Sequence, residues 1–532
     1  MSTDTSVTLP PVEHEITPEE HRRILLILGA LMLGMFLSAL DQTIVSTALP
    51  TIAGKLHGLD HMSWVVTSYL LATTVSTPLW GKLGDLYGRK GFYQLSIVIF
   101  LVGSALAGLS QNMTMLIACR ALQGLGAGGL MVGSQAVVGD VIPPRHRGKY
   151  MGYFGAVFGL SSILGPLAGG LFTQDLSWRW IFYINIPVGV VAFITIASVL
   201  HVPVRKVTHS IDYLGLFLLS AGATAVILVT TWGGSTYSWG SPTVVGTSLV
   251  GVGCLIAWAF VEVRAKEPII PLHLFRIRTF SAATAVSFVI GFTMFGAIIF
   301  LPLYLQVVHG VSPTISGLEM LPMIAGMLLT FIFTGRMVSR TGRYKIFPVV
   351  GSAVLAGGFL VLSRLGLDST YSEAAIGMFI VGLGMGLVMQ ILVVVVQNAV
   401  PHDKLGTATS TATFFRTIGG AFGVAALGDL FDNRLTAHLR SVLPPSDLKL
   451  VQSGSLASNP QSIDQLPTHL RILFENAFGQ SIQSLFVVAA PIAILAFLLA
   501  FLIKEVPLRT SAHVVPDQED GSEVTPLGLL DA

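Results

Sequence analysis

The sequence predicts an all-α membrane protein with fourteen transmembrane helices. Of its 532 residues, 52% are hydrophobic and only 11% are charged, whereas a soluble domain carries about 25% charged residues. The hydrophobic residues gather in runs of about 20, the length at which a helix crosses the roughly 30 Å hydrocarbon core of a bilayer. So few charges cannot cover a soluble globule of this size, and the lipid bilayer is therefore the expected solvent.

The apolar runs follow one another along the whole chain. The first begins at Ile24 behind an acidic tail. A secretory signal has a basic head and a shorter apolar core, so we expect this run to remain as a spanning helix. The runs lie at about 24–50, 63–84, 92–110, 113–138, 149–172, 179–200, 213–232, 243–263, 281–308, 317–338, 346–366, 373–399, 405–430 and 482–503.

Lysine and arginine are unevenly distributed between the two sides of the predicted membrane. Where successive runs alternate in direction, 21 of these residues fall on one side and 7 on the other. Cytoplasmic loops are the ones enriched in them, so both termini of this multi-pass chain are expected in the cytoplasm, at the plasma or inner membrane. The net charge of +2 gives no field that favours nucleic acid as a partner.

A short repeat divides the chain into two halves. The loop at 81–90, GKLGDLYGRK, follows the second run, and the loop at 335–343, GRMVSRTGR, follows the tenth. Matching loops at equivalent places indicate a transporter built from two parallel repeats. The predicted units are an N-terminal tail (1–23), a six-helix bundle (24–200), a two-helix insertion with basic linkers (201–280), a second six-helix bundle (281–503) with an external loop (431–481), and a C-terminal tail (504–532).

Two ionisable residues in the first half are functional candidates, because a charge inside the bilayer is costly. Asp41 lies 17 residues past Ile24, about 25 Å along the first helix at 1.5 Å per residue. Arg120 lies 7 residues into the fourth run, about 10 Å from the outer side by the same rise. The opposite charges can therefore meet, either as a proton-exchanging pair or as a salt bridge that only holds two helices together.

The second half offers further polar candidates. Arg416 lies 11 residues into the thirteenth run, near the middle of the membrane. Its partner is not readable from the sequence, and Gln390, Gln397 or a group of the substrate are the alternatives. Glu319, near the outer end of the tenth run, is either a second protonation or cation site or a solvated glutamate at a helix start. The substrate-cavity candidates are Gln123, Glu319, Gln390, Gln397 and Arg416.

Several segments resemble the fourteen-helix drug:proton antiporter branch of the major facilitator superfamily. The loop at 81–90 resembles the superfamily's loop signature, and LDQTIVSTALP at 40–50 is similar to the branch's first helix, although Ser46 stands where many members have Asn. WRWIFYINIP at 178–187 is similar to the start of its sixth helix, but it also suits an interfacial aromatic belt. The resemblance covers nearly the whole chain and implies the major facilitator fold, with two six-helix bundles plus two additional central helices.

The resemblance also implies roles for particular residues. In the family, the loop at 81–90 acts as a latch on the inner gate. The gating candidates carried over in this way are Gly81, Asp85, Gly88 and Arg89, with Asp140 as their acidic partner. RALQGLGAGG at 120–129 resembles the segment whose arginine is assigned to proton transfer. Asp41 would then be the proton-binding carboxylate and Arg120 the residue that tunes it.

The fifth run resembles the antiporter signature of the superfamily, which marks exporters rather than uptake symporters. Glycines spaced by four make a smooth stripe against which another helix can lie, and a proline kinks the helix. The residues that carry this resemblance are Gly159, Gly165, Pro166, Gly169 and Gly170.

Neither enzyme chemistry nor a nucleotide-driven pump is indicated. The sequence contains no HExxH, CxxC, GxSxG or GxxxxGK[ST] pattern, and the GxGxxG at 124–129 continues an apolar helix without a preceding strand. No cofactor and no metal site are therefore expected. The resemblance implies proton-coupled antiport of amphipathic small molecules. A proton-coupled transporter of one metabolite or lipid is the alternative, and a membrane-embedded enzyme would need a cluster of His, Asp or Ser that the sequence lacks.

Overall fold

The computed structural model of the protein describes residues 18–56, 58, 61–200, 211–234, 236–367, 369–443 and 467–508. Within these residues the chain forms helices joined by turns, and β pairing is limited to one isolated bridge between Gly233 and Tyr237. The expected all-α fold is confirmed for this part of the chain. Helices pair their backbone N–H and C=O groups internally. This is necessary in lipid, because the hydrocarbon core offers these groups no hydrogen-bond partners.

The N-terminal helices pack together as one bundle. α4 lies against α2 and α3, and α1 lies against α5 and α7. The bounds of this group are α1 Pro18–Lys55, α2 Met62–Tyr87, α3 Arg89–Gly108, α4 Met113–Val141, α5 Pro144–Gln174, α6 Trp180–Tyr183 and α7 Asn185–Val199.

The C-terminal helices form a second bundle, in which α10 contacts α15 and α17 while α14 contacts α12 and α13. Between the bundles, α8 and α9 pack on each other, and α8 contacts both α2 and α15. The bounds are α8 Tyr213–Trp232, α9 Pro242–Arg264, η2 Leu272–Arg276, α10 Arg278–Val308, α11 Pro313–Glu319, α12 Leu321–Thr341, α13 Ile346–Leu362, α14 Tyr371–Ala399, η3 His402–Lys404, α15 Leu405–Val442 and α17 Thr468–Ala500. The exact residue limits of the predicted domains stay a prediction.

Each of the fourteen predicted runs coincides with one helix or with two helices in line. Twelve helical segments of the described chain are long and apolar enough to span a membrane, including Trp180–Val199 (α6 with α7) and Ile315–Thr341 (α11 with α12). α13 is a shorter apolar helix, and α2 is more polar. The hydroxyls of Thr73, Thr74 and Thr77 on α2 donate to carbonyls one turn earlier at 2.7 Å, which removes most of their cost in lipid.

The outer surface of the helices is apolar. On α9, Leu249 is 69% exposed, Phe260 62% and Val263 72%. A soluble protein seldom exposes so long an apolar stripe. The bilayer is therefore the solvent for this face, as the composition predicted.

Three helix ends extend furthest beyond the predicted boundaries. α1 begins at Pro18, α15 continues to Val442, and α17 begins at Thr468. The predicted external loop 431–481 is thus helical at both of its ends. Hydropathy reports only where lipid stops, whereas helical hydrogen bonding continues into water when a stripe of apolar side chains can still pack.

Such a stripe is present beyond the predicted end of the thirteenth run. Phe431, Leu435 and Leu439 are all at most 6% exposed, and the ring of Phe431 lies 5.0 Å from that of Phe478. The remainder of the predicted loop (444–466), most of the two tails (1–17 and 509–532) and the link 201–210 lie outside the described residues.

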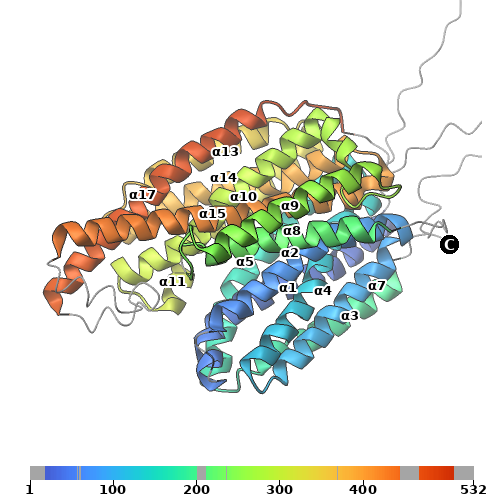
Figure 1. Ribbon diagram of the computed structural model, residues 1–532. Coiled ribbons are helices and arrows are strands. Elements are labelled where there is room, and N and C mark those ends of the chain that lie inside the picture. The colour runs from blue at the N-terminus through green and yellow to red at the C-terminus, as the bar shows by residue number, and fades with distance from the viewer. Residues whose placement is uncertain are drawn as a thin grey trace, which may run out of the picture.

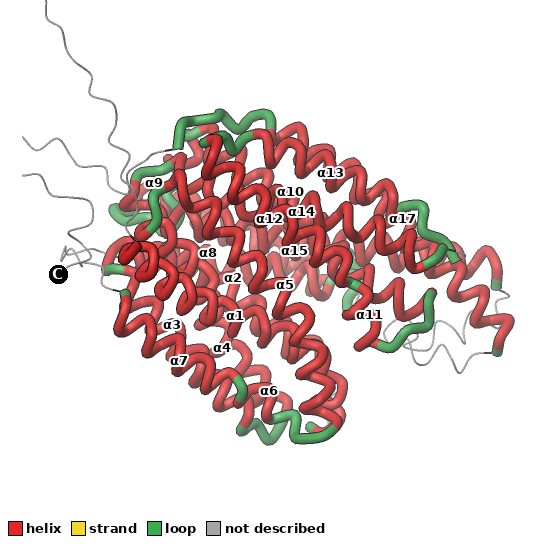
Figure 2. Tube along the Cα trace, turned by 180° about the vertical axis from the view of Figure 1, so that it is seen from behind, coloured by secondary structure: helices red, strands yellow, loops and turns green. Residues whose placement is uncertain are grey.

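The two bundles converge at one end of the molecule and diverge toward the other (Figures 1 and 2). We call the convergent end the basic end. It holds the turn at Gly88, the turn at 142–143, the linker 265–277, the turn 342–345, and η3. Contacts of α2 with α15 and of α5 with α12 join the bundles.

Close helix contacts depend on glycine at particular places. A Cβ on Gly382 of α14 would lie 2.0 Å from the backbone oxygen of Met323 on α12, whereas a Cβ on Gly357 of α13 would meet nothing within 4 Å. The first contact cannot be relieved by rotating a side chain, because the obstructing atom belongs to the backbone.

We expect Gly382→Ala to lower the thermal stability of the detergent-purified protein, since overpacking a tight helix contact costs about 1–3 kcal/mol. Gly357→Ala is the matched control, and it should leave the melting temperature unchanged or slightly raised, because alanine favours the helix by about 0.5–1 kcal/mol. Equal melting temperatures for the two variants would show that the α12 and α14 contact is looser than described.

Candidate functional site

Asp41 and Arg120 are brought into direct contact inside the first bundle. Asp41 on α1 is 0% exposed and Arg120 on α4 is 1% exposed, and Arg120 Nη1 donates to Asp41 Oδ2 at 2.5 Å. The membrane depths that the sequence predicted for Asp41 and Arg120 are therefore compatible with this contact. A buried ion pair is stable only when further hydrogen bonds replace the water that both charges have lost.

Two amide side chains supply those hydrogen bonds. Gln123 Oε1 accepts from Arg120 Nη1 at 2.8 Å, and Gln123 Nε2 donates to Asp41 Oδ1 at 2.7 Å. Asn185, at the start of α7, donates to the same Oδ1 at 3.1 Å and to the Ser104 hydroxyl of α3 at 3.0 Å. Gln123, which the sequence placed in the substrate cavity, thus belongs to the charge network around Asp41.

The face of the guanidinium is covered by an aromatic ring. The Cζ atom of Arg120 lies 4.1 Å from the ring centre of Tyr69 on α2, a cation–π geometry. The Tyr69 hydroxyl in turn lies 3.2 Å from the Ser38 hydroxyl of α1. Every polar group around the pair is thus provided by the first bundle.

Sequence reasoning missed Asn185 and Tyr69 as parts of this network. Asn185 was included only in the aromatic segment 178–187, although a single amide inside an apolar run is a signal that could have marked it. Tyr69 carried no such signal, because tyrosine is common in membrane helices. Two atoms of the network, Arg120 Nε and Asn185 Oδ1, are buried without a hydrogen-bond partner among the described residues.

The second charged cluster lies at the basic end, where Asp85 of α2 meets the start of α15. Asp85 Oδ1 accepts from the Gly406 amide at 2.9 Å, and Oδ2 accepts from the Thr407 amide at 2.6 Å and its hydroxyl at 2.7 Å. The first amides of a helix have no partner within the helix and carry the positive end of its dipole. One carboxylate therefore fastens the first bundle to the second.

Arg89 links this carboxylate to a second one. Its Nη2 atom lies 2.7 Å from Asp85 Oδ1, and its Nε atom is paired with Asp140 Oδ2 at the end of α4. Gly88 between α2 and α3 has φ +94°, a backbone angle that favours glycine. This turn places Asp85 and Arg89 side by side.

Gly81 makes the junction of α2 and α15 possible, since a Cβ there would lie 2.2 Å from Ser410 Oγ and 2.6 Å from the Gly406 oxygen. Further contacts at this end include Lys82 Nζ to Glu267 Oε2 at 2.6 Å and Gln397 Nε2 to the Gln135 oxygen at 3.0 Å. Gln397 therefore takes part in the junction between the bundles.

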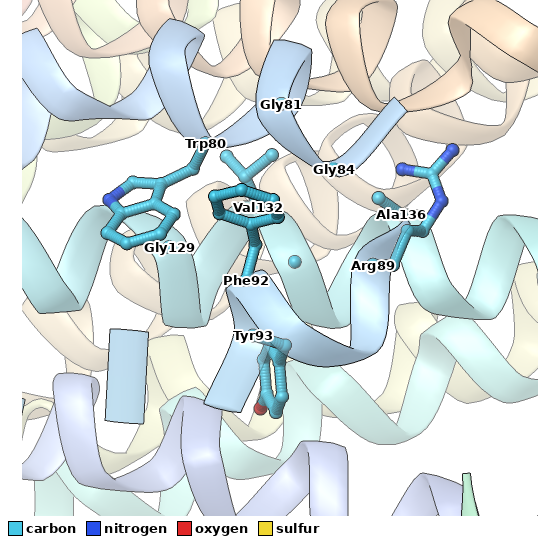
Figure 3. A pocket seen from close by; sticks show the side chains of 10 residues that line it. Trp80, Gly81, Gly84, Arg89, Phe92, Tyr93, Gly129, Val132 and Ala136 are labelled. Carbon is cyan, nitrogen blue, oxygen red and sulfur yellow. The ribbon is translucent and has the colours of Figure 1, made fainter. Parts of the chain in front are cut away.

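A hollow lies beside the gating residues, between α2, α3 and α4 (Figure 3). The rings of Trp80 and Phe92 border it with their centroids 6.3 Å apart, and Trp80 Nε1 donates to the Leu125 oxygen at 2.7 Å. Arg89 also lines the hollow. Apart from Arg89, the residues that line the hollow carry no charge, so the hollow adds no further charge to the gating cluster.

The glycines of α5 serve different contacts. A Cβ on Gly159 would lie 2.8 Å from Ile324 of α12 in the other bundle, and one on Gly165 would lie 2.1 Å from Thr43 of α1. Gly169 is also packed on α1, Gly170 has nothing within 4 Å, and Pro166 lies 3.5 Å from the position that a Cβ on Gly317 would take. α5 therefore touches both bundles along this stripe.

The remaining candidates of the second bundle form no hydrogen bond or ion pair with one another in the described chain. Glu319 lies where α11 ends, at the end of the molecule opposite the basic end, with its Oε2 buried and unpaired among the described residues. Gln390 on α14 is 6% exposed, and its Oε1 is likewise unpaired. Arg416 on α15 is half-buried, without an ion pair or side-chain hydrogen bond to any residue of the described chain.

Comparison with known proteins identifies the family. The profile described as Major Facilitator Superfamily matches residues 31–424. An uncharacterised MFS-type transporter of Mycobacterium tuberculosis is 43% identical over 496 residues, which cover 93% of this chain and 72% of that protein. The multidrug transporter protein MdtP of Bacillus subtilis is 39% identical over 498 residues, which cover 94% and 88%.

Among solved structures, the human organic anion transporter MFSD10 matches with a TM-score of 0.61 at 15% identity, covering 91% of this chain and all of that one. This likeness concerns the fold alone. The profile match and the two bacterial relatives together show that the chain is a membrane transporter and not an enzyme, and that it belongs to the Major Facilitator Superfamily.

Proposed function

We propose that this transporter exports amphipathic small molecules from the cell in exchange for protons. The observation that carries the proposal is the fully buried carboxylate of Asp41, held by Arg120, Gln123 and Asn185. The sequence relatives support export of drug-like molecules, because a fungal relative that is 34% identical over 500 residues is named an efflux pump and MdtP is named a multidrug transporter. The mostly apolar interior surfaces of the bundles suit an amphipathic cargo.

Proton exchange at Asp41 would alter the balance of charge in the first bundle. Protonation removes the negative charge that Arg120 faces, and the ion pair becomes a weaker bond from a cationic donor to a neutral carboxyl group. The guanidinium then needs another acceptor, and Asn185 Oδ1 is a buried acceptor without a partner. A change of partner of this kind would connect proton uptake to a shift of α4 against α1 and α7.

The junction at the basic end would act as the inner gate. Opening this end requires Asp85 to leave the amides of Gly406 and Thr407, and it requires α2 to separate from α15. We propose that the contacts described here belong to the state closed toward the cytoplasm, with Arg89 and Asp140 holding Asp85 in place. The glycine stripe of α5 would let this helix slide or tilt on α12.

The basic end would face the cytoplasm of a cell whose plasma or inner membrane holds the protein, and both termini would lie on that side. The working units would be the bundles 24–200 and 281–503, with the insertion 201–280 between them. The basis for this orientation is the excess of lysine and arginine at the basic end.

Asp41→Asn should abolish transport driven by a pH gradient while substrate still exchanges down its own gradient, because asparagine keeps the size of the side chain but cannot titrate. Purified protein in proteoliposomes, with an imposed pH gradient, gives the measurement. Undiminished pH-driven transport by the variant would remove Asp41 from the proposed mechanism.

A charge-neutral double variant separates the proton role from a structural one. Asp41→Asn alone leaves Arg120 buried opposite a neutral group, which costs up to about 3–5 kcal/mol if the site cannot rearrange. Asp41→Asn with Arg120→Gln removes both charges, so we expect it to melt closer to the parent than the single variant does. If the double variant melts like the parent and still couples transport to the pH gradient, the Asp41–Arg120 pair is only a structural salt bridge and takes no part in proton coupling.

Asp85→Asn should reduce turnover at least ten-fold at equal expression, since charge-assisted hydrogen bonds contribute about 1.5–3 kcal/mol each and asparagine presents one acceptor oxygen instead of two. Thr407→Val, which removes only the hydroxyl donor, should produce a smaller loss. The exposed Asp175 at the other end of the molecule provides the control as Asp175→Asn. Turnover rates in proteoliposomes are the measurement, and equal rates for Asp85→Asn and Asp175→Asn would contradict the gating role.

The proposed orientation predicts the accessibility of tags in intact cells. A tag inserted in the turn at 88 or placed after Ala532 should be protected from an external protease, whereas a tag at Ser455 should be cleaved. An accessible C-terminal tag together with a protected tag at 88 would require an odd number of spans after that turn's helix pair, whereas reversed results for all three tags would invert the orientation.

A further inference from the structure

Two polar side chains in the middle of the second bundle have no partner within the described residues. Gln390 of α14 is 6% exposed, and its Oε1 atom is buried without a hydrogen bond. Arg416 of α15 is half-buried and makes no ion pair there. The first bundle, by contrast, neutralises its buried arginine with Asp41. Arg416 is thus an uncompensated positive charge in the transmembrane part of the molecule.

The register between α14 and α15 places these two side chains at the same level. Gln397 Nε2 donates to Thr409 Oγ1 at 3.0 Å, so these residues face each other near the basic end. Gln390 precedes Gln397 by seven residues, and Arg416 follows Thr409 by seven. Seven residues are close to two turns and advance about 10 Å along a helix. Because the two helices run in opposite directions, both steps lead away from the basic end on the same facing sides.

The other sides of α15 are already in use near Arg416. Phe414 and Ile418 pack with residues of α8 in one apolar cluster, and they lie about 160° from Arg416 around the helix, at 100° per residue. Phe422, which is 41% exposed, lies about 120° from Arg416 on another side of α15. Arg416 thus points away from α8, toward the side that α14 shares with the interior of the bundle.

A third polar group lies one turn from Arg416 on the same helix. The hydroxyl oxygen of Thr413 is buried, and among the described residues it has no hydrogen-bond partner, while the side chain is 5% exposed. A guanidinium offers a planar pair of donors that matches a carboxylate, and the Gln390 amide and Thr413 hydroxyl can each add a donor. Buried polar groups without partners are the ones that discriminate strongly between ligands, because a ligand that leaves them unpaired is penalised.

We propose that Arg416, Gln390 and Thr413 form a subsite that binds a carboxylate group of the transported molecule. The subsite deepens the proposed export of amphipathic molecules and rests on it. It assigns a preferred chemistry to the cargo: an apolar or aromatic body that bears an oxygen anion. Arg120 cannot serve this purpose while Asp41 occupies it.

A pair of dyes that differ in one group tests the subsite. Rhodamine B carries a free carboxylate, and its ethyl ester has the same aromatic body without the negative charge. Their equilibrium binding to the purified full-length protein is measured by fluorescence anisotropy, with empty detergent micelles as the baseline. We expect the parent protein to bind rhodamine B more tightly than the ester.

Arg416→Gln should weaken the binding of rhodamine B about ten-fold or more, the loss expected when a charge-assisted hydrogen bond is removed. The binding of the ester should change by less than about two-fold. Arg416→Lys should give an intermediate loss for rhodamine B, because the charge remains but the paired donors do not. Arg364→Gln is the matched control, because Arg364 is exposed just after the end of α13. It should change the binding of neither dye.

Gln390→Leu keeps approximately the same volume and removes both the donor and the acceptor. It should weaken the binding of rhodamine B about three-fold or more and leave the binding of the ester unchanged. If Arg416→Gln does not fold, the subsite is tested with Arg416→Lys and Gln390→Leu. The quantity compared is then the ratio of the affinities for rhodamine B and its ester. A parent that binds both dyes equally would overturn the subsite, as would variants that lose both dyes in parallel or neither of them.

The binding assay does not depend on proton coupling. If a pH gradient moves neither dye while the parent still prefers rhodamine B through Arg416, the proposed antiport fails and the subsite stands. If the pH gradient drives export of both dyes at rates unaffected by Arg416→Gln and binding shows no preference, the subsite fails and the antiport stands.

Discussion

The structure depends on the constraint that a charge inside a bilayer is costly unless a partner compensates it. A lone charge at the membrane centre costs at least about 2.5–3.5 kcal/mol, so the few ionisable residues of the spans organise their surroundings. Asp41 draws side chains from two other helices, α4 and α7, into one network of hydrogen bonds. The apolar remainder of the bundles packs around that network.

The same constraint explains the junction at the basic end. Asp85 is buried there, and its charge is balanced by Arg89 from its own bundle and by helix amides from the other. An attachment made through backbone amides needs no second acidic or basic side chain on α15. It is also directional, since it exists only while the start of α15 faces the end of α2. Such a contact can be broken as a unit, which suits a gate better than many dispersed apolar contacts would.

The two bundles share an architecture but differ in electrostatics. The first carries a neutral ion pair whose groups are almost completely hydrogen-bonded, whereas the second carries Arg416 without an acidic partner in the described chain. The proposed proton exchange and the proposed cargo subsite would therefore lie in different halves. Because the halves meet at the basic end and through α5 and α12, a change in one can be transmitted to the other.

The sequence by itself determined the helical class and the order of the apolar runs, and it indicated that Asp41 and Arg120 could meet. Lipid leaves helices as the only option for such runs, and helix rise converts residue number into depth. Only the tertiary structure decided that Asn185 and Tyr69 complete the Asp41 network, that Asp85 fastens to the Gly406 and Thr407 amides, and how far α15 and α17 extend. Those features depend on which faces of distant helices meet, and on amides that every residue possesses, so no pattern of side chains along the chain could reveal them.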